Sequence, residues 1–215
     1  MRYPLVDTNF QTEAVVVANG DFPTHAIPLA LLHRATYVCC CDGAAQQLSG
    51  RGIVPDAIVG DGDSLPPELR QKYGSIVHIV DEQDDNDLTK ATRYCMALGF
   101  RRITYIGTTG RREDHTLGNI SLMARYRAEM GLDVTLLTDY GWFVPLKGYA
   151  ELQTFAGQQV SIFNLSCTDI SAEGLKWDCY AYSQWWQGTL NEALGERIIM
   201  HGDGNYMVFR NYNIE

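Results

Sequence analysis

The chain has 215 residues, 46% hydrophobic and 20% charged, a composition typical of a soluble globular protein with one large domain or two modest ones. Its formal net charge of −9 argues against a nucleic-acid backbone as a partner and is compatible with a site that collects divalent cations. No apolar run approaches the ~20 residues of a membrane span, and Met1–Asp7 has no signal-peptide core. We therefore expect a cytoplasmic protein with no membrane or nucleic-acid partner.

The first two-thirds of the chain alternates short apolar or β-branched runs with helical patterns. Strands are expected at residues 14–18, 36–41, 56–59, 75–80, 102–106 and 133–137. Helices are expected between them, at about residues 29–33, 44–48, 66–72 and 87–98 and after residue 115. This alternation predicts an α/β fold, a doubly wound and mainly parallel sheet with helices on both faces.

From about Gly141 the pattern changes to short strands separated by glycines, with no convincing helix. The strand candidates are residues 142–144, 149–152, 159–163, 197–200 and 206–209. We therefore predict an α/β domain at residues 1–140 and a smaller all-β sandwich domain at residues 141–215. No low-complexity linker separates them, so the two parts are expected to pack together.

The six cysteines are expected to be buried free thiols. Three form the run Cys39–Cys41 in a strand, where successive side chains point to opposite faces. No C-x-x-C pair is present, so free thiols are favoured over a zinc site or a disulfide framework.

Acidic residues follow the predicted parallel strands in turn. Asp42 ends the second strand, Asp61 and Asp63 follow the third, and the fourth leads to Asp84 and Asp87. Because the carboxyl ends of parallel strands share one edge of the sheet, these carboxylates are expected to meet there. Hard oxygen ligands suit Mg²⁺, which commonly bridges to substrate phosphates. Taken singly, each acid could instead be a turn former, and Asp87 could be only a helix N-cap.

Two segments are candidate phosphate sites. Asn86–Lys90 begins a helix whose free N–H groups favour an anion, and Lys90 adds a positive charge. Gly107–Gly110 precedes the next helix, with Arg112 as a forked donor. Arg112 and Lys90 could instead be solvated surface charges. Neither a G-x-x-x-x-G-K-[ST] loop nor a G-x-G-x-x-G loop after the first strand is present, which excludes P-loop kinases and ordinary dinucleotide enzymes.

Several separated motifs resemble the thiamine pyrophosphokinase family. Pro55–Ser64 is similar to the signature P-D-x-I-x-G-D-x-D-S, which is the most specific of them. Cys41–Leu48 resembles the segment D-G-G-A-N-x-L, and Asp84–Lys90 matches D-x-x-D-x-x-K. Gly107–His115, with Asn119, matches G-x-x-G-G-R-x-D-H and its following Asn.

The resemblance extends into the β half, where Gly174–Trp177 and Thr189–Glu192 resemble the G-L-K-W and T/S-x-N-E elements. It implies that diphosphate is transferred from ATP to the hydroxyethyl group of thiamine, leaving AMP. It also implies an α/β nucleotide domain, a β-sandwich that binds thiamine and dimerises, and a homodimer with thiamine at the subunit boundary.

Carried over by position, the resemblance implies a set of site residues. Mg²⁺ and the ATP phosphates would be held by Asp42, Asp61, Asp63 and Asp87. Further ATP contacts would come from Gly43, Lys90, Thr109 and Arg112. Gln83, Asp114 and Thr189 would lie near thiamine, with Trp177 and Asn191 near the interface. The expected catalytic residues are Asp61, Asp63, Asp87 and Asp114, and either of the last two could accept the hydroxyl proton.

Three residues depart from the family pattern. Ala44 and Arg111 replace glycines, and Thr189 stands where Ser is frequent. If the glycine at position 111 needs a positive φ, this loop is expected to differ locally. Two other functions stay open: a pyrophosphokinase for another alcohol, such as a hydroxymethyl-pterin, and a non-catalytic thiamine or nucleotide sensor.

Overall fold

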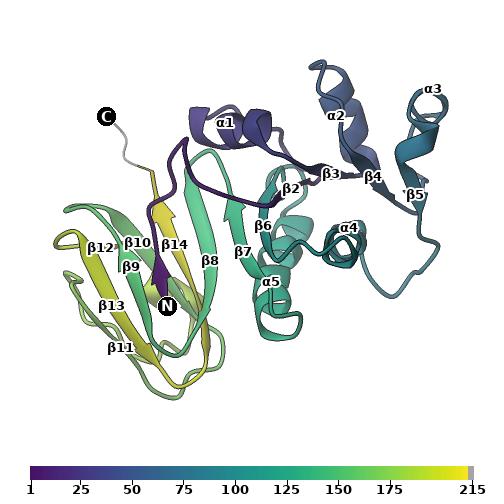
Figure 1. Cartoon of the computed structure of the whole chain (residues 1–215). Helices are drawn as coiled ribbons and strands as arrows, with labels where there is room; N and C mark the ends of the chain where they lie inside the picture. Colours follow the sequence, from purple (N-terminus) through teal and green to yellow (C-terminus); the bar gives the residue numbers. More distant parts are fainter. Residues whose placement is uncertain (213–215) are drawn as a thin grey trace.

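The computed structural model describes residues 1–212, which form a large sheet, a small sheet and five α-helices. Figure 1 shows the helices around one end of the large sheet and the small sheet beside the other end. The first strands of the large sheet are β2 (Ala14–Val17), β3 (Val38–Cys41), β4 (Ala57–Gly60), β5 (Val77–Ile79), β6 (Arg102–Ile106) and β7 (Asp133–Leu137). The helices are α1 (Ala26–Arg34), α2 (Ala45–Ser49), α3 (Pro67–Lys72), α4 (Asp87–Ala97) and α5 (Glu113–Ala128).

The strands β2 to β7 are parallel to their neighbours and lie in the order β5-β4-β3-β2-β6-β7. All four residues of β2, β3 and β4 are buried, because helices cover both faces of the sheet. Residues of α1 and α2 pack on one face, and residues of α4 and α5 pack on the other. The predicted doubly wound α/β architecture is therefore confirmed.

The strand order reverses between β2 and β6. The chain moves outward from β2 through β3, β4 and β5, and then returns to add β6 and β7 on the other side of β2. Ligands of open α/β sheets bind at the carboxyl ends of the strands beside such a reversal. The loops that follow β2, β3, β4 and β6 all leave the sheet at this edge.

The β half contributes strands to both sheets. The large sheet continues from β7 into β8 (Gly141–Lys147), β14 (Asn205–Asn211), β10 (Gln159–Asn164) and β12 (Asn191–Glu192). The small sheet has the order β1-β9-β13-β11 and consists of β1 (Arg2–Tyr3), β9 (Ala150–Gln153), β13 (Arg197–Gly202) and β11 (Ile170–Glu173). The two parts of the chain thus share one ten-stranded sheet, joined by antiparallel pairing of β7 with β8.

The predicted division at residues 140 and 141 falls between two adjacent strands of this shared sheet. The N-terminal strand β1 pairs with β9 and so belongs to the small sheet, although the prediction grouped it with the α/β part. The assignment of separate functions to residues 1–140 and 141–215 stays a prediction.

Three strands were not predicted, namely β1, β11 and β12. Each has two to four residues, and the sequences Arg2–Tyr3, Ile170–Glu173 and Asn191–Glu192 carry little apolar alternation. These segments are extended because partner strands are available, which single-sequence patterns do not report.

All six cysteines are free, as predicted, and five of them are buried, but the expected burial is wrong for Cys179, which is only partly buried. Cys39 and Cys41 face the core under α4 and α5, and Cys40 faces the opposite core. Within residues 1–212, none of the helices is both long enough and apolar enough to span a membrane.

Candidate functional site

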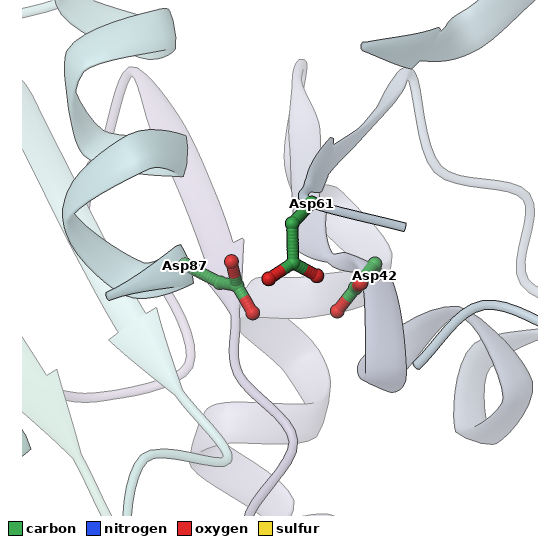
Figure 2. Close-up of side chains that lie close together, drawn as sticks. All are labelled: Asp42, Asp61 and Asp87. Carbon is green, nitrogen blue, oxygen red and sulfur yellow. The ribbon is translucent and has the colours of Figure 1, made fainter. Parts of the chain in front are cut away.

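Three carboxylates converge at the carboxyl edge of the parallel strands. Asp42 follows β3, Asp61 follows β4, and Asp87 is the first residue of α4. One oxygen from each lies within 4.8 Å of the others. Figure 2 shows the three side chains pointing toward one another from separate elements. The predicted meeting of acids from successive strand ends is thus present in the geometry for three residues.

Asp42 is buried and held by backbone N–H groups on both of its oxygens. Its Oδ1 accepts a hydrogen bond from the N–H of Gly43 at 2.6 Å. Its Oδ2 accepts from the N–H groups of Gly62 at 3.1 Å and Ser64 at 3.3 Å. The loop after β4 therefore wraps around the Asp42 carboxylate and fixes its orientation.

Two glycines of the loop after β4 are required by the geometry of that loop. A Cβ atom on Gly60 would lie 2.7 Å from Cγ of Asp42, closer than real Cβ contacts allow. Gly62 adopts a φ of 86°, which strains any residue with a side chain. Gly60 therefore makes room for Asp42, and Gly62 provides the left-handed turn of this loop.

Asp63, the fourth predicted metal ligand, is not part of the group of three carboxylates. Its side chain is exposed, and its backbone N–H donates to Oδ1 of Asp61 at 3.1 Å. Direct ligation of a metal by Asp63 stays a prediction.

The N-terminus of α4 is capped by Asn86, whose side-chain oxygen accepts from the N–H of Thr89. The alternative in which Asp87 only caps the helix is therefore wrong. The buried Lys90 places its Nζ 3.3 Å from Oδ1 of Asp87, so it is not a solvated surface charge. Burial raises the pKa of the Asp87 carboxyl, the neighbouring Asp42 carboxylate raises it further, and Lys90 acts in the opposite direction.

The loop between β5 and α4, which carries Gln83, is tied down by Asp85. The Asp85 carboxylate forms an ion pair with Arg93 at 2.5 Å and accepts a hydrogen bond from Arg125 of α5 at 2.6 Å. The guanidinium of Arg125 lowers the pKa of Asp85, and Arg93 lowers it further. Sequence reasoning gave Asp85 no role, because its partners are far along the chain.

The loop between β6 and α5 keeps a glycine-like turn without the glycine. Arg111 adopts a φ of 58°, and its Nη1 donates to Oδ1 of Asn19 at 2.9 Å. A left-handed backbone costs a non-glycine residue roughly 1–2 kcal/mol. This loop was expected to differ locally at Arg111. Its backbone instead keeps the left-handed conformation that a glycine would adopt there.

Asn19, which lies directly after β2 and was not among the predicted site residues, connects the loops at the strand reversal. Its Oδ1 also accepts from Nε2 of Gln47 at 3.2 Å. A Cβ atom on Gly43 would lie 2.3 Å from Nδ2 of Asn19, so the predicted ATP-contact residue Gly43 is packed tightly against it. The signal in the sequence that could have identified Asn19 is its place as a polar residue directly after the first buried strand.

Arg112 and Asp114 pair with each other at the start of α5. The guanidinium donates to both carboxylate oxygens, at 2.5 Å and 3.1 Å, and both side chains are exposed. This pairing, with a further hydrogen bond from the N–H of His115, lowers the pKa of Asp114 to about 2. Asp114 is thus ionised and already engaged.

Two cavities flank the β6–α5 loop. One of about 280 Å³ is lined by Asn19, Gly20, Thr108, Gly110, Arg111, Arg112, His115 and Asn119. The other, of about 370 Å³, includes Thr109 and the aromatic residues Phe143 and Phe209. The predicted ATP-contact residues Arg112 and Thr109 therefore line adjoining spaces at the strand reversal.

In the β half, Asn191 holds the backbone of Trp177. Its side chain accepts from the Trp177 N–H at 3.2 Å and donates to the Trp177 carbonyl at 3.0 Å. Asn191 is buried, and the Trp177 ring is 53% exposed. Thr189 bonds to the carbonyl of Trp186, and both Trp185 and Trp186 are exposed, which excludes them from the sandwich core.

The predicted thiamine contacts fall into two groups. Gln83 follows β5 at one end of the ten-stranded sheet, and Asn191 lies in β12 at the other end. Nine strand spacings correspond to roughly 40 Å across the sheet. One chain therefore does not bring these residues together.

Two family models match the chain. The model described as "Thiamin pyrophosphokinase, catalytic domain" matches residues 29–136. The model described as "Thiamin pyrophosphokinase, substrate-binding domain" matches residues 141–209.

Curated relatives carry the same family name. The chain is 31% identical over 162 residues to thiamine pyrophosphokinase 1 of Oryza sativa subsp. japonica, covering 63% of this chain and 59% of the rice protein. It is 34% identical over 86 residues to thiamine pyrophosphokinase of Bacillus subtilis, covering 38% of this chain and 40% of that protein. The matched regions span less than two thirds of these relatives.

Solved structures agree in fold. Thiamin pyrophosphokinase from Candida albicans superimposes with a TM-score of 0.79 at 18% identity, covering 99% of this chain and 92% of that one. Thiamine pyrophosphokinase from Bacillus subtilis gives a TM-score of 0.74 at 19% identity, covering 94% and 99%. Because the family models match both parts of the chain, the protein belongs to the thiamin pyrophosphokinase family.

Proposed function

We propose that the protein is a Mg²⁺-dependent thiamine diphosphokinase, which transfers diphosphate from ATP to the hydroxyl of thiamine and releases AMP. The carrying observation is the convergence of Asp42, Asp61 and Asp87 within 4.8 Å at the carboxyl edge of the sheet. Without cations, three carboxylates at this distance would repel one another strongly.

The donor set fits Mg²⁺. All three groups are hard carboxylate oxygens, and Asp42 is fixed by three backbone N–H groups. When bound, Mg²⁺ would neutralise charge on the phosphate oxygens. Asp42, Asp61 and Asp87 would hold it, with Asp63 as a further proposed ligand.

The β6–α5 loop supplies the proposed ATP contacts. Arg112 lines a cavity beside this loop and presents a forked donor suited to phosphate. Thr109 and Gly43 lie at the same strand reversal, and Lys90 lies beside Asp87. The residues act by placing the diphosphate in line with the attacking hydroxyl, because phosphoryl transfer needs little covalent work by the protein.

Arg112 has two proposed partners for one edge of its guanidinium. While its Nε and Nη2 pair with both oxygens of Asp114, that edge is not available to a phosphate. ATP and Asp114 therefore compete for this edge. Release of Arg112 would raise the pKa of Asp114 and free its carboxylate, either to accept the hydroxyl proton or to balance the positive charge of thiamine.

The active site is proposed to be shared between two chains of a homodimer. Gln83 and Asp114 belong to the α/β part, and Trp177, Thr189 and Asn191 lie at the far end of the same sheet. A second copy can bring its Trp177 to the first copy's Gln83, and the exposed Trp177 ring suits an interface. A cytoplasmic location stays a prediction.

The product of the reaction tests the function. The protein is incubated with Mg-ATP and thiamine, and the nucleotides and thiamine esters are separated by chromatography. Formation of AMP and thiamine diphosphate in equal amounts, abolished by EDTA and restored by Mg²⁺, is the expected result. Formation of ADP, or turnover only with a hydroxymethyl-pterin, would contradict it, and binding without turnover would favour a sensor.

A further inference from the structure

A cavity of about 560 Å³ lies between the N-terminal residues 1–11 and strands β7, β8 and β14. Its wall includes Trp142 and Val144 of β8, Arg210 of β14 and Gln153 of β9. It shares no lining residue with the acidic cluster or with the two cavities beside the β6–α5 loop. The proposed diphosphate transfer does not use it.

Arg210 is a buried cation in this wall. Its side chain is 1% exposed, its Nη1 donates to the Gln153 carbonyl at 2.6 Å, and its guanidinium lies 4.8 Å from the centre of the Trp142 ring. None of the ion pairs among residues 1–212 includes Arg210. Burial lowers its pKa to about 9, so the guanidinium is still protonated at pH 7.

Two donors of the same wall lack partners. Nε of Arg210 and Nε1 of Trp142 are buried and make no hydrogen bond within the described part of the chain. Both groups can only donate. A buried charge and a buried donor without partners are each costly, and an acceptor that carries negative charge would satisfy both.

The rest of the cavity suits a small organic acid. Val6, Phe10 and Val144 provide apolar surface. The lining also holds Arg2 and Arg102, but these form ion pairs with Glu151 and Asp133, so Arg210 is the arginine of this lining without a carboxylate partner in the described part of the chain. A volume of about 560 Å³ lies within the usual range for small-molecule sites, about 300–1,000 Å³.

We propose that this cavity binds a small organic carboxylate, with its carboxylate at Arg210 and Trp142 and its apolar body against Val6, Phe10 and Val144. A single guanidinium matches one carboxylate in charge and in its forked geometry. The site is separate from the proposed active site.

Titration calorimetry with sodium benzoate tests the proposal, with benzamide as the neutral ligand of the same shape. Wild-type protein should bind benzoate saturably and benzamide at least about tenfold more weakly, since hydrogen bonds to charged groups are the stronger ones. Arg210→Met should weaken benzoate binding at least about tenfold, and Trp142→Phe several-fold. The control Arg102→Met, which removes an exposed arginine of the same cavity, should change it less than about threefold.

Equal binding of benzoate and benzamide, no binding of benzoate, or unchanged affinity in Arg210→Met would overturn the proposal. If Arg210→Met does not fold, Trp142→Phe decides, because it keeps the aromatic wall and removes only the donor. A variant ending at Tyr212 identifies one other occupant. If benzoate binds only to that variant, the chain's own C-terminal carboxylates fill the cavity and the proposal is wrong.

Discussion

Two regions of the molecule differ in how much of a site one chain builds. One is the carboxyl edge of the parallel strands, and the other is the tip of the β half, which is the region around Trp177, Leu190 and Asn191. At the edge, Asp42 is buried and fixed by three backbone N–H groups, and Asp61 and Asp87 lie within reach of it. At the tip, the backbone of Trp177 is held by Asn191, but its ring faces solvent. The edge is a preorganised cluster of carboxylates that suits the proposed cation site, and the tip leaves an exposed aromatic ring that suits the proposed contact surface.

The two regions also share a feature. Arg111 beside the edge and Leu190 at the tip are the two non-glycine residues with positive φ in the described part of the chain. Such backbone persists only where surrounding contacts enforce it, and it concentrates at functional sites. The comparison therefore predicts that damage at the edge abolishes chemistry, and that damage at the tip weakens binding and can be repaired by a second chain.

Asp61→Asn is expected to have the largest effect. Removing one carboxylate from the cluster should lower kcat for AMP formation by at least about a hundredfold. The reason is that neutralisation of charge on the phosphate oxygens accounts for most of the catalysis of phosphoryl transfer. Asp63→Asn removes the further proposed ligand, and because Asp63 is exposed and lies outside the cluster, its loss should be smaller, about tenfold. Circular dichroism should show both variants folded. Equal losses in the two variants would make Asp63 a metal ligand of the same rank.

Trp177→Ala should act on substrate binding. Loss of an exposed aromatic contact should raise the KM for thiamine about tenfold with a smaller change in kcat. Trp186→Ala removes a neighbouring ring that is 72% exposed, and its KM should stay within about twofold of wild type. A fall in kcat alone for Trp177→Ala would place its ring away from thiamine.

Mixing the two damaged proteins tests the shared site. In a dimer of Asp61→Asn with Trp177→Ala, one site combines the intact Asp61 of one chain with the intact Trp177 of the other. Random exchange should restore about a quarter of wild-type activity at low thiamine concentration, because half of the dimers are mixed and each has one intact site. Activity equal to the mean of the two separate variants would place the whole site within one chain.

Gly60→Ala should disturb the edge without removing a charge. The added Cβ would meet Cγ of Asp42 at 2.7 Å, so the carboxylate must shift. We expect a several-fold loss of kcat and a free energy of unfolding lower by about 1–3 kcal/mol. Gly74→Ala is the control, because no atom lies within 4 Å of its added Cβ and its φ is not positive. Similar losses in both variants would contradict the packing of Asp42 on Gly60.

The sequence was sufficient for the α/β part because three of its strands are uninterrupted buried runs, β2, β3 and β4, and β6 and β7 are buried after their first residue. The sequence also predicted the acidic cluster, because the carboxyl ends of parallel strands lie at one edge of the sheet. It did not reveal that β8 extends the same sheet, because alternating strands report burial and not their partners.

Other site features depend on contacts between distant segments. Asn19 meets Arg111 across 92 positions, and Asp85 meets Arg125 across 40. Neither pair has a local pattern, and a lone Asn or Asp in a loop is ordinary turn chemistry. The left-handed backbone at Arg111 was also out of reach, since arginine itself disfavours it.

The left-handed backbone at Arg111 provides the prediction with the smallest expected effect. Because φ is 58° at Arg111, Arg111→Gly should give a free energy of unfolding about 1 kcal/mol higher than Arg111→Ala in urea denaturation, since only glycine relieves the strain. At Ser121, an exposed position inside α5, the order should reverse, because glycine in a helix is less favourable than alanine. The same order at both positions would mean that residue 111 does not keep this left-handed backbone. Opposite orders would show that the edge keeps a glycine turn at a position where the sequence has an arginine.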